Sequence, residues 1–370
     1  MASVHLYIHV PFCQRRCSYC DFSIAVRKRI PTGTYVQTIL TEAARIPASY
    51  LETIYLGGGT PSLLPPDAIR TLLRELTQRF RIPHSALPIE VTLEANPEDV
   101  SLESARAWRA AGINRVSLGA QSFDDAVLQW MHRSHDAAQT KRAVQALRDA
   151  GIENISLDLI FGLPEELKRD WERDLDILAS LLPAHCSLYG LTVEPRTPLD
   201  RWISRGATHA PEDERYAEEY LAAHRRLTAA GFEFYEVSNA ARDGYRSRHN
   251  SAYWSGKPYV GLGPAAHSFD GTTRRWNLRA WEAYRRAIAE GRSAVESEET
   301  LTDEQRELEA VYLGLRTAEG FDFAALRRPS PPPHLAAQGW VYENEGRLRC
   351  TPEGWLRLDS IVNEYDSATH

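Results

Sequence analysis

Cysteine is scarce in this chain, with five among 370 residues. The rest of the composition is ordinary, at 43% hydrophobic and 25% charged residues, which are the proportions of a globular protein with ample material for a core. This balance excludes the fibrous, disulfide-scaffold and disordered classes. Length alone allows two or three domains, although α/β barrels often exceed 200 residues as one unit.

An excess of positive charge is also missing. Lys and Arg total 43 against 50 Asp and Glu, so the formal net charge is −7. No overall positive field therefore exists to attract nucleic acid. Basic residues cluster at 27–29, 242–248 and 274–286, and each cluster is typical of scattered surface charge. We expect no nucleic-acid partner.

Long apolar runs and a secretory leader are absent too. Residues 1–10 carry no basic segment ahead of an apolar stretch, and Cys13 follows too soon for a signal peptide. The longest stretch without Asp, Glu, Lys or Arg is 177–193, which Pro183 interrupts. It is shorter than the roughly 20 residues that a bilayer helix needs. We expect a cytoplasmic protein without a transmembrane helix.

What the first half of the chain does contain is a regular alternation of short aliphatic runs with amphipathic helical patterns. Helical patterns include 66–79 and 103–110, the second stopped by Gly112. Such alternation predicts βα units around a parallel sheet. Six repeats without a seventh or eighth predict an α/β fold, a partial TIM-like (β/α)6 barrel. The expected strands are 6–10, 53–56, 90–94, 115–118, 154–160 and 187–193.

The alternation weakens after residue 195. We divide the chain into a barrel with its cysteine loop at 1–230, a connecting segment at 231–295 and a C-terminal domain at 296–370. In that last part, helical patterns precede a strand pair that turns near 344–346, which predicts a small α+β, winged-helix-like module. Because the basic excess of DNA-binding modules is missing, we expect it to pack or dock.

Three cysteines follow the first predicted strand. Cys13, Cys17 and Cys20 have the spacing C-x3-C-x2-C, and three thiols within eight residues indicate a metal site. Structural zinc normally takes four ligands, and Cys186 and Cys350 are far away in sequence. Three cysteines can instead hold three irons of a [4Fe-4S] cluster and leave the fourth iron open to a small ligand.

Further polar or glycine residues follow the next strands, where ligands gather in parallel sheets. The run 57–61 is Gly-Gly-Gly-Thr-Pro, whose backbone can approach a ligand closely. Glu94 ends the third strand and can accept hydrogen bonds from a ligand's hydroxyls or amine. Asp158 interrupts an apolar strand and needs a partner. An internal arginine or amide network and a bound ligand are equally good explanations for it.

The cysteine spacing, with Phe22 following it, resembles the radical S-adenosylmethionine (SAM) superfamily. The resemblance implies a partial barrel and a [4Fe-4S] cluster whose unique iron is chelated by SAM, which an electron can split to a deoxyadenosyl radical. The full pattern is similar to the coproporphyrinogen-dehydrogenase-like branch. On that resemblance the cluster ligands are Cys13, Cys17 and Cys20, and the SAM pocket comprises Tyr7, Tyr19, Gly58, Gly59, Thr60, Glu94, Gln121, Arg133 and Asp158.

Two features separate the members of that branch. The dehydrogenases carry a fourth cysteine where this chain has Phe22. The stretch 249–254, His-Asn-Ser-Ala-Tyr-Trp, instead resembles the H-N-x-x-Y-W signature of the branch's heme chaperones. Histidine can ligate heme iron, and Tyr and Trp offer flat apolar faces to a porphyrin. The residues assigned to heme are therefore His249, Asn250, Tyr253 and Trp254, with His267 and His9 as competing iron ligands and Arg246 and Arg248 as partners for propionates.

The resemblance implies a heme chaperone that carries heme as cargo to respiratory heme proteins of the membrane. It further implies contact with the inner membrane face and a capacity to form homodimers. We assign no catalytic residue, and whether the chain is an enzyme stays open. One alternative is a radical SAM enzyme acting on a porphyrin, although Phe22 argues against coproporphyrinogen oxidation. Another is a zinc-stapled scaffold without redox chemistry.

Overall fold

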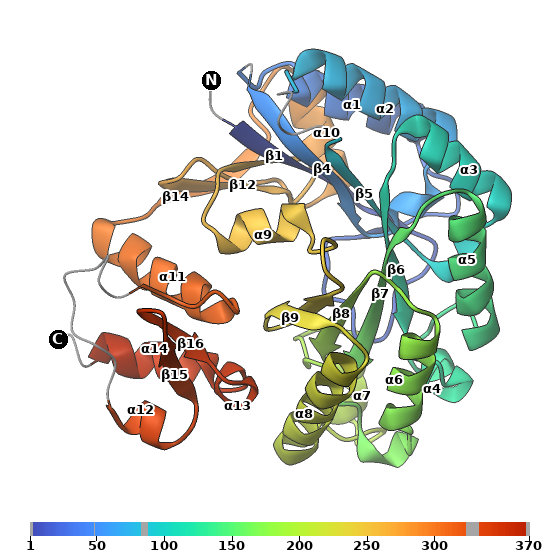
Figure 1. Cartoon of the computed structure of the whole chain (residues 1–370). Helices are drawn as coiled ribbons and strands as arrows, with labels where there is room; N and C mark the ends of the chain where they lie inside the picture. Colours follow the sequence, from blue (N-terminus) through green and yellow to red (C-terminus); the bar gives the residue numbers. More distant parts are fainter. Residues whose placement is uncertain (1–2, 48, 83–87, 323–332, 368–370) are drawn as a thin grey trace.

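A single large sheet organises the chain. The computed structural model describes residues 3–47, 49–82, 88–322 and 333–367 (Figure 1). Within these residues, one twelve-stranded sheet has the order β14-β13-β12-β11-β1-β4-β5-β6-β7-β8-β10-β9. Its centre is six parallel strands, β1 (Ser3–Val10), β4 (Tyr50–Gly58), β5 (Glu90–Ala95), β6 (Arg115–Gln121), β7 (Asn154–Phe161) and β8 (His185–Gly190).

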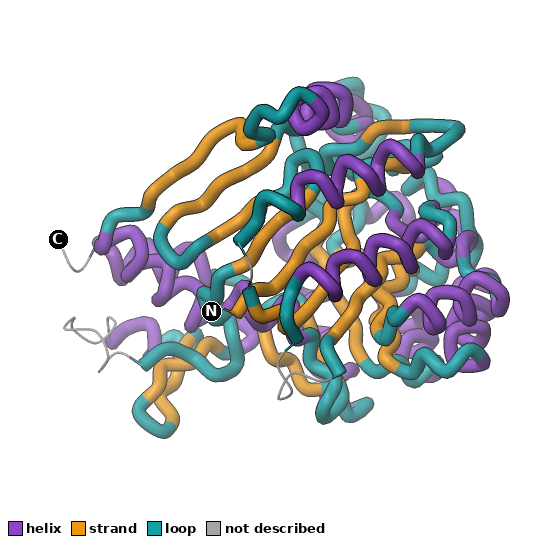
Figure 2. The backbone as a smooth tube through the Cα atoms, turned by 90° about the horizontal axis from the view of Figure 1, so that it is seen from above, coloured by secondary structure: helices purple, strands orange, loops and turns teal. Residues whose placement is uncertain are grey.

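Helices connect these strands and lie along the outer side of the curved sheet (Figures 1 and 2). Local signals fix their ends: α3 begins after Ser101, whose side chain forms a capping box with Ser104, and stops at Gly112, where φ is +107°. The series is α1 (Thr32–Ala43), α2 (Pro66–Arg79), α3 (Leu102–Ala111), α4 (Asp125–Trp130), α5 (Ala137–Asp149) and α6 (Trp171–Ser180).

The partial barrel expected from the sequence is confirmed, including all six of its strands. The sixth strand was placed at 187–193, and there the prediction is wrong at both ends, because β8 begins at His185 and ends at Gly190. The reason is the neighbouring strand. Since β7 ends at Phe161, opposite Gly190, residues 191–193 have no continuing strand of β7 to pair with.

Residues 233–300 add short strands at both edges of the barrel sheet. On the β8 side lie β9 (Glu233–Glu236) and β10 (Asn239–Ala241); on the β1 side lie β11 (Tyr259–Leu262), β12 (His267–Phe269), β13 (Thr273–Asn277) and β14 (Val295–Thr300). The accompanying helices are α7 (Pro198–Ser204), α8 (Asp213–Ala229), α9 (Arg248–Trp254) and α10 (Trp281–Ala289). The division of the chain at 230 and 295 stays a prediction.

The C-terminal module is a small α+β unit beside α8 (Figure 1). Its hairpin turns at Glu345 and Gly346, both with positive φ, as a tight two-residue turn requires. The elements are α11 (Asp303–Arg316), α12 (Pro333–Ala337), β15 (Val341–Asn344), β16 (Arg347–Cys350), α13 (Pro352–Trp355) and α14 (Leu358–Ser367). The expected strand pair near 344–346 is confirmed.

Helix α11 spans the opening of the incomplete barrel. It starts just after β14, at one edge of the sheet. Its far end meets the opposite edge, where Thr317 bridges Glu236 of β9 and the Val237 amide donates to the Arg316 carbonyl at 3.1 Å. The two edges of the sheet are therefore joined through this helix.

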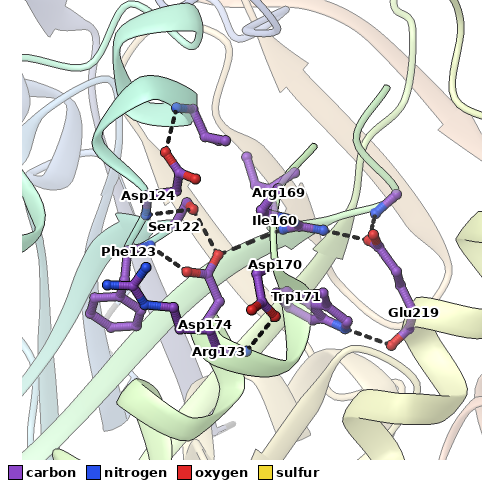
Figure 3. Close-up of polar contacts among 12 residues, drawn as sticks. Ser122, Phe123, Asp124, Ile160, Arg169, Asp170, Trp171, Arg173, Asp174 and Glu219 are labelled. Carbon is purple, nitrogen blue, oxygen red and sulfur yellow. Dashed lines mark hydrogen bonds and ion pairs between the residues drawn. The ribbon is translucent and has the colours of Figure 1, made fainter. Parts of the chain in front are cut away.

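A buried ion network ties together the loops that follow β6 and β7 (Figure 3). The Arg169 guanidinium contacts Glu219 of α8 and lies 3.9 Å from Asp174 of α6. Asp174 in turn accepts from the Ser122 hydroxyl at 2.7 Å and the Phe123 amide at 2.9 Å. Because these groups are buried, their pairing holds both loops at the carboxyl edge of the sheet.

Candidate functional site

A cavity of about 380 Å³ opens at the carboxyl ends of the parallel strands, and we call it the cysteine cavity. All three clustered cysteines line it. The other two do not: Cys186 lies in β8 and Cys350 in β16, both buried. Of the residues expected to bind SAM, Tyr19, Gly58, Gly59, Thr60, Glu94, Gln121, Arg133 and Asp158 line this cavity.

Two of the three thiols accept hydrogen bonds from polar side chains that suit thiolates. Thr60 Oγ1 donates to Cys13 Sγ at 3.3 Å, and Arg133 Nη1 donates to Cys17 Sγ at 3.5 Å. Burial raises the pKa of Cys13 and raises that of Cys20 to about 11. Buried thiols of this kind ionise when a metal binds them.

No three His, Cys, Asp or Glu side chains among the described residues converge closely enough to hold one metal ion. A single zinc ion needs such convergence. A [4Fe-4S] cluster does not, because each cysteine binds a different iron. The donor set, three thiols around one cavity, therefore fits a cluster better than a lone ion.

Two glycines bring the end of β4 against the cysteine loop. A Cβ on Gly59 would stand 2.9 Å from Cys13 Sγ and 2.8 Å from the Phe12 carbonyl oxygen. Gly58 has a φ of +113°, and a Cβ there would meet the His9 ring. Only glycine fits both positions without displacing the loop.

Glu94 is held at the cavity wall by two donors. It accepts from the Tyr55 hydroxyl at 2.8 Å and from the Gly58 amide at 2.9 Å. Burial raises the pKa of its carboxyl to about 7, although these hydrogen bonds oppose the rise. Glu94 is therefore poised to change charge near neutral pH, at the edge of the cavity.

Asp158 has a polar network and also faces the cavity. Its carboxylate accepts from the Ser117 hydroxyl at 2.9 Å and from the Ser156 hydroxyl at 3.0 Å. Burial raises its pKa, while hydrogen bonds with Ser187, Ser117 and Ser156 and the charge of Arg115 act in the opposite direction. Both explanations that the sequence left open therefore have support, since an internal network positions a carboxylate that lines the site.

Gln121, at the end of β6, and Arg133, after α4, both line the cavity. Gln121 has a φ of +65°, an uncommon conformation for glutamine that is often found at functional sites. Arg133 Nη2 donates to Asn96 Oδ1 at 2.6 Å and to the Gly119 carbonyl at 2.9 Å, and its Nε has no protein partner. The Arg133 side chain is therefore held in place beside Cys17.

Several further lining residues were not selected from the sequence. Asn96 directly follows β5 and Tyr189 lies near the end of β8, so the carboxyl-end rule points to both. Ser117 lies inside β6 and His132 follows α4, and neither position carries a signal in the sequence.

Tyr7 lies outside the cysteine cavity and lines a neighbouring one of about 760 Å³, which we call the aromatic cavity. Aromatic side chains dominate its wall: Tyr253 and Trp254 of α9, Tyr259 of β11, Phe269 of β12 and Trp276 of β13. Asp21, Phe22, Gly58 and Glu94 line both cavities, so the two adjoin.

The expected heme residues separate into two groups. Tyr253 and Trp254 face the aromatic cavity, whereas His249 and Asn250 do not line it. The His249 ring is fully buried, with Nδ1 2.7 Å from Thr53 Oγ1 and Nε2 2.8 Å from the Tyr253 hydroxyl. Burial lowers its pKa to about 3, so the ring is neutral at physiological pH. Both nitrogens are engaged, and the ring reaches a ligand only by leaving these partners.

The other two candidate histidines both line the aromatic cavity, and they differ in whether their ring nitrogens are hydrogen-bonded. His9 is buried, with Nδ1 3.2 Å from the Tyr7 hydroxyl and Nε2 3.0 Å from the Ser23 carbonyl. His267 is exposed on the aromatic cavity, and its ring stacks on Trp276 with centroids 5.8 Å apart. The two expected propionate partners do not line that cavity, because Arg246 pairs with Glu233 and Glu319 and Arg248 donates to the Pro88 carbonyl.

Comparisons with known proteins agree with this geometry. The Radical SAM superfamily matches residues 7–178, and the HemN C-terminal domain matches residues 301–357. Among solved structures, coproporphyrinogen III oxidase (HemN) from Escherichia coli superposes with a TM-score of 0.82, covering 99% of this chain and 90% of that one. At 22% identity this likeness shows the fold alone. Fold and domains together define a radical SAM protein with a HemN-type C-terminal domain.

Relatives in sequence narrow the assignment. The heme chaperone HemW of Bacillus subtilis is 35% identical, covering 97% of this chain and 98% of the relative. HemW of Mycobacterium tuberculosis is 36% identical, covering 96% and 93% respectively. The mitochondrial radical S-adenosyl methionine domain-containing protein 1 of mouse is 33% identical, covering 96% and 86%. The chain belongs to the HemW family.

Proposed function

We propose that this protein is a heme chaperone that holds a [4Fe-4S] cluster and SAM in the cysteine cavity and carries heme as cargo. The observation that carries the proposal is the pair of adjoining cavities, one lined by thiols and the other by aromatic rings. Relatives of nearly equal length that bear the name heme chaperone support it.

Cys13, Cys17 and Cys20 are the proposed cluster ligands. A bound cluster would supply one-electron chemistry and an open iron for the amino and carboxylate groups of SAM. Gly58 and Gly59 line the cavity without a side chain, so a ligand can approach their backbone closely. The Arg133 guanidinium lies beside the Cys17 thiol. Glu94 and Asp158 offer carboxylates for the hydroxyls and the amine of SAM.

The aromatic cavity is the proposed place for heme. A porphyrin is flat and apolar with carboxylates at one edge, and ligand cavities of 300–1,000 Å³ lined by aromatic side chains suit such molecules. Lys257, Arg274 and Arg279 stand at its rim to meet the carboxylates. We propose respiratory heme proteins of the membrane as recipients.

Contact with a membrane belongs to the same proposal. None of the helices in the described residues is long and apolar enough to cross a bilayer. Docking at the inner membrane face and homodimer formation would therefore use surface contacts, and a cytoplasmic location is part of the proposal.

The second candidate function is a radical SAM enzyme that acts on a porphyrin. One observation favours it: the aromatic cavity adjoins the cysteine cavity, so a porphyrin there would lie beside SAM. Phe22 argues against the coproporphyrinogen reaction. It lies on both cavities where the dehydrogenases carry a fourth cysteine, and it is 58% exposed.

The test is anaerobic reconstitution with iron and sulfide, followed by heme addition in the presence of SAM. We expect about four irons and four sulfides per chain, a stable heme complex seen by absorption spectroscopy, and unchanged porphyrin. Cys17→Ala serves as the matched variant and should fail to load the cluster. Porphyrin conversion coupled to deoxyadenosine release, without a stable heme complex, would establish the enzyme instead. A colourless protein that retains zinc would contradict both.

A further inference from the structure

The aromatic cavity contains one histidine with a free ring. His267 projects from β12 and stacks on Trp276 at an interplanar angle of 25°. Among the described residues, its ring nitrogens make no hydrogen bond, whereas both nitrogens of His249 and of His9 are engaged. An imidazole ligates iron through an unprotonated nitrogen with a free lone pair, and His267 alone of these three offers one at the cavity surface.

The charge around His267 favours the ligating form. Partial burial lowers its pKa, and the nearby guanidiniums of Arg274 and Arg279 lower it further. The ring is therefore neutral at physiological pH and needs no proton release to bind a metal. The same cations suit a ligand that carries carboxylates near its metal-binding centre.

The three cations that line the cavity differ in whether they form ion pairs with other residues. Arg274 pairs with Glu309 of α11 and lies over the Phe269 ring. Lys257 and Arg279 form no ion pair with another described residue, although both line the cavity. Two unpaired cations at the rim of an aromatic cavity leave positive charge for an anionic ligand edge.

His249 lies outside the aromatic cavity and contacts one of the residues that line it. Its Nε2 holds the Tyr253 hydroxyl, and its Nδ1 is anchored on Thr53 of β4, 196 residues away in sequence. The Tyr253 ring that it holds packs edge-on against Tyr259, with centroids 4.6 Å apart. The histidine of the H-N-x-x-Y-W stretch thus fixes the position of Tyr253, one of the aromatic residues that line the cavity.

We propose that His267 is the protein ligand of the heme iron in the aromatic cavity, with the propionates directed to Lys257 and Arg279, and that His249 is a positioning residue for Tyr253. This inference rests on the proposed heme-chaperone function. It places the iron beside β12 and the porphyrin face against α9, next to the cysteine cavity.

The test is a heme titration of the full chain, reconstituted with its cluster, followed by absorption and electron paramagnetic resonance spectra of the bound heme. His267→Ala should lose the nitrogen-ligated spectrum and bind heme at least about tenfold more weakly. Added imidazole should restore that spectrum, because the truncated side chain leaves room for it. His209→Ala is the matched control, since His209 is an exposed histidine that does not line the cavity.

A second variant separates ligation from positioning. Tyr253→Phe removes the hydroxyl that His249 holds and leaves both histidines intact. It should weaken heme binding while the nitrogen-ligated spectrum persists. Loss of that spectrum in His249→Ala, with His267→Ala unchanged, would overturn the inference and leave the chaperone function standing. A reconstituted wild-type protein that binds no heme would overturn both.

Discussion

Residues of one type have different chemistry here because their surroundings differ. His249 is buried behind the aromatic cavity with its ring hydrogen-bonded to Thr53 and Tyr253, whereas the His267 ring lines the cavity and makes no hydrogen bond within the described residues. The carboxylates differ as well: Glu166, which is hydrogen-bonded to Thr208 and His209, has a pKa near 2, whereas burial brings Glu94 to about 7. The surroundings of each carboxyl group set its pKa, and therefore decide whether its charge can change near neutral pH when a ligand binds.

Glu94 predicts a pH dependence of SAM binding. Its carboxyl is mostly protonated below pH 7 and ionised above it, and hydroxyl or amine donors on a ligand bind the ionised form better. Affinity should therefore rise between about pH 6 and pH 8. Glu94→Gln should weaken binding about tenfold or more and remove this rise. Calorimetric titration of the reconstituted protein measures both effects. Glu75→Gln, on the surface of α2, is the control. An unchanged slope in Glu94→Gln would contradict the assignment.

The close packing of Gly59 against the cysteine loop predicts that a larger residue there impairs cluster loading without unfolding the protein. Gly59→Ala places a methyl group 2.9 Å from Cys13 Sγ, so the cysteine loop must shift. We expect normal circular dichroism but less than half of the iron and sulfide of wild type after reconstitution. Gly33→Ala is the control, because a Cβ at Gly33 in α1 has no neighbour within 4 Å. Equal iron content in both variants would show that the loop tolerates the shift.

At this scale, local spacing predicted part of the site and missed the rest. The interval between Cys13, Cys17 and Cys20 and the run 57–61 are local patterns, and the structure brings both to one cavity. The engagement of His249 was not predictable, because it depends on a hydroxyl that is 196 residues away. The assignment of Tyr7 to the other cavity was also beyond the sequence, since it requires knowing which side of β1 faces which wall.

Among the elements, the loops that carry the site depend on buried ion pairs behind them. Arg169 holds the loops after β6 and β7 together from within (Figure 3). A buried charge that loses its partner is costly, whereas an exposed pair contributes little. The position of Gln121 and its neighbours thus rests on side chains that do not line the cavity.

Arg169→Ala should therefore destabilise the protein strongly. It leaves Asp174 buried without its cation and removes one of the two cations of Glu219, which keeps Arg215, and we expect a loss of about 3–5 kcal/mol in the free energy of unfolding. Urea unfolding followed by circular dichroism measures it. Arg226→Ala breaks an exposed pair with Asp176 and should change the free energy of unfolding far less, because solvent screens that pair. Similar midpoints for both variants would show that the buried network contributes no more than a surface pair.

The predictability of elements followed their length and pattern. The six central strands and helices such as 66–79 have strong apolar periodicity, and the structure confirms them. Strands β9 to β13 are three to five residues long and mix polar with aromatic residues, so periodicity did not reveal them. Their pairing is set by the edges of the barrel sheet, which the local sequence does not encode.

In the whole molecule, the C-terminal module covers the opening of the incomplete barrel. Helix α11 runs from the β14 edge of the sheet to the β9 edge and carries residues of the aromatic cavity, Glu309 and Leu313, on the way. The buried ion pair between Arg316 and Glu236, 2.8 Å apart, fixes its far end. Cargo in that cavity would contact the barrel and α11 together, so docking of the module and the shape of the cavity are coupled.

Trp355 anchors that module, and its removal should loosen the module before the barrel. Its indole Nε1 donates to the Leu315 carbonyl at 3.0 Å, and the ring is 7% exposed beside His224 of α8. Trp355→Ala should cost about 3–5 kcal/mol through the cavity it leaves. In hydrogen exchange, β15, β16 and α14 should lose protection while β4 to β7 keep theirs, because the indole ties the module to α11 and α8. Tyr342→Ala, at a side chain 45% exposed, should change neither region. Equal loss of protection in β4 to β7 would mean that module and barrel unfold as one unit.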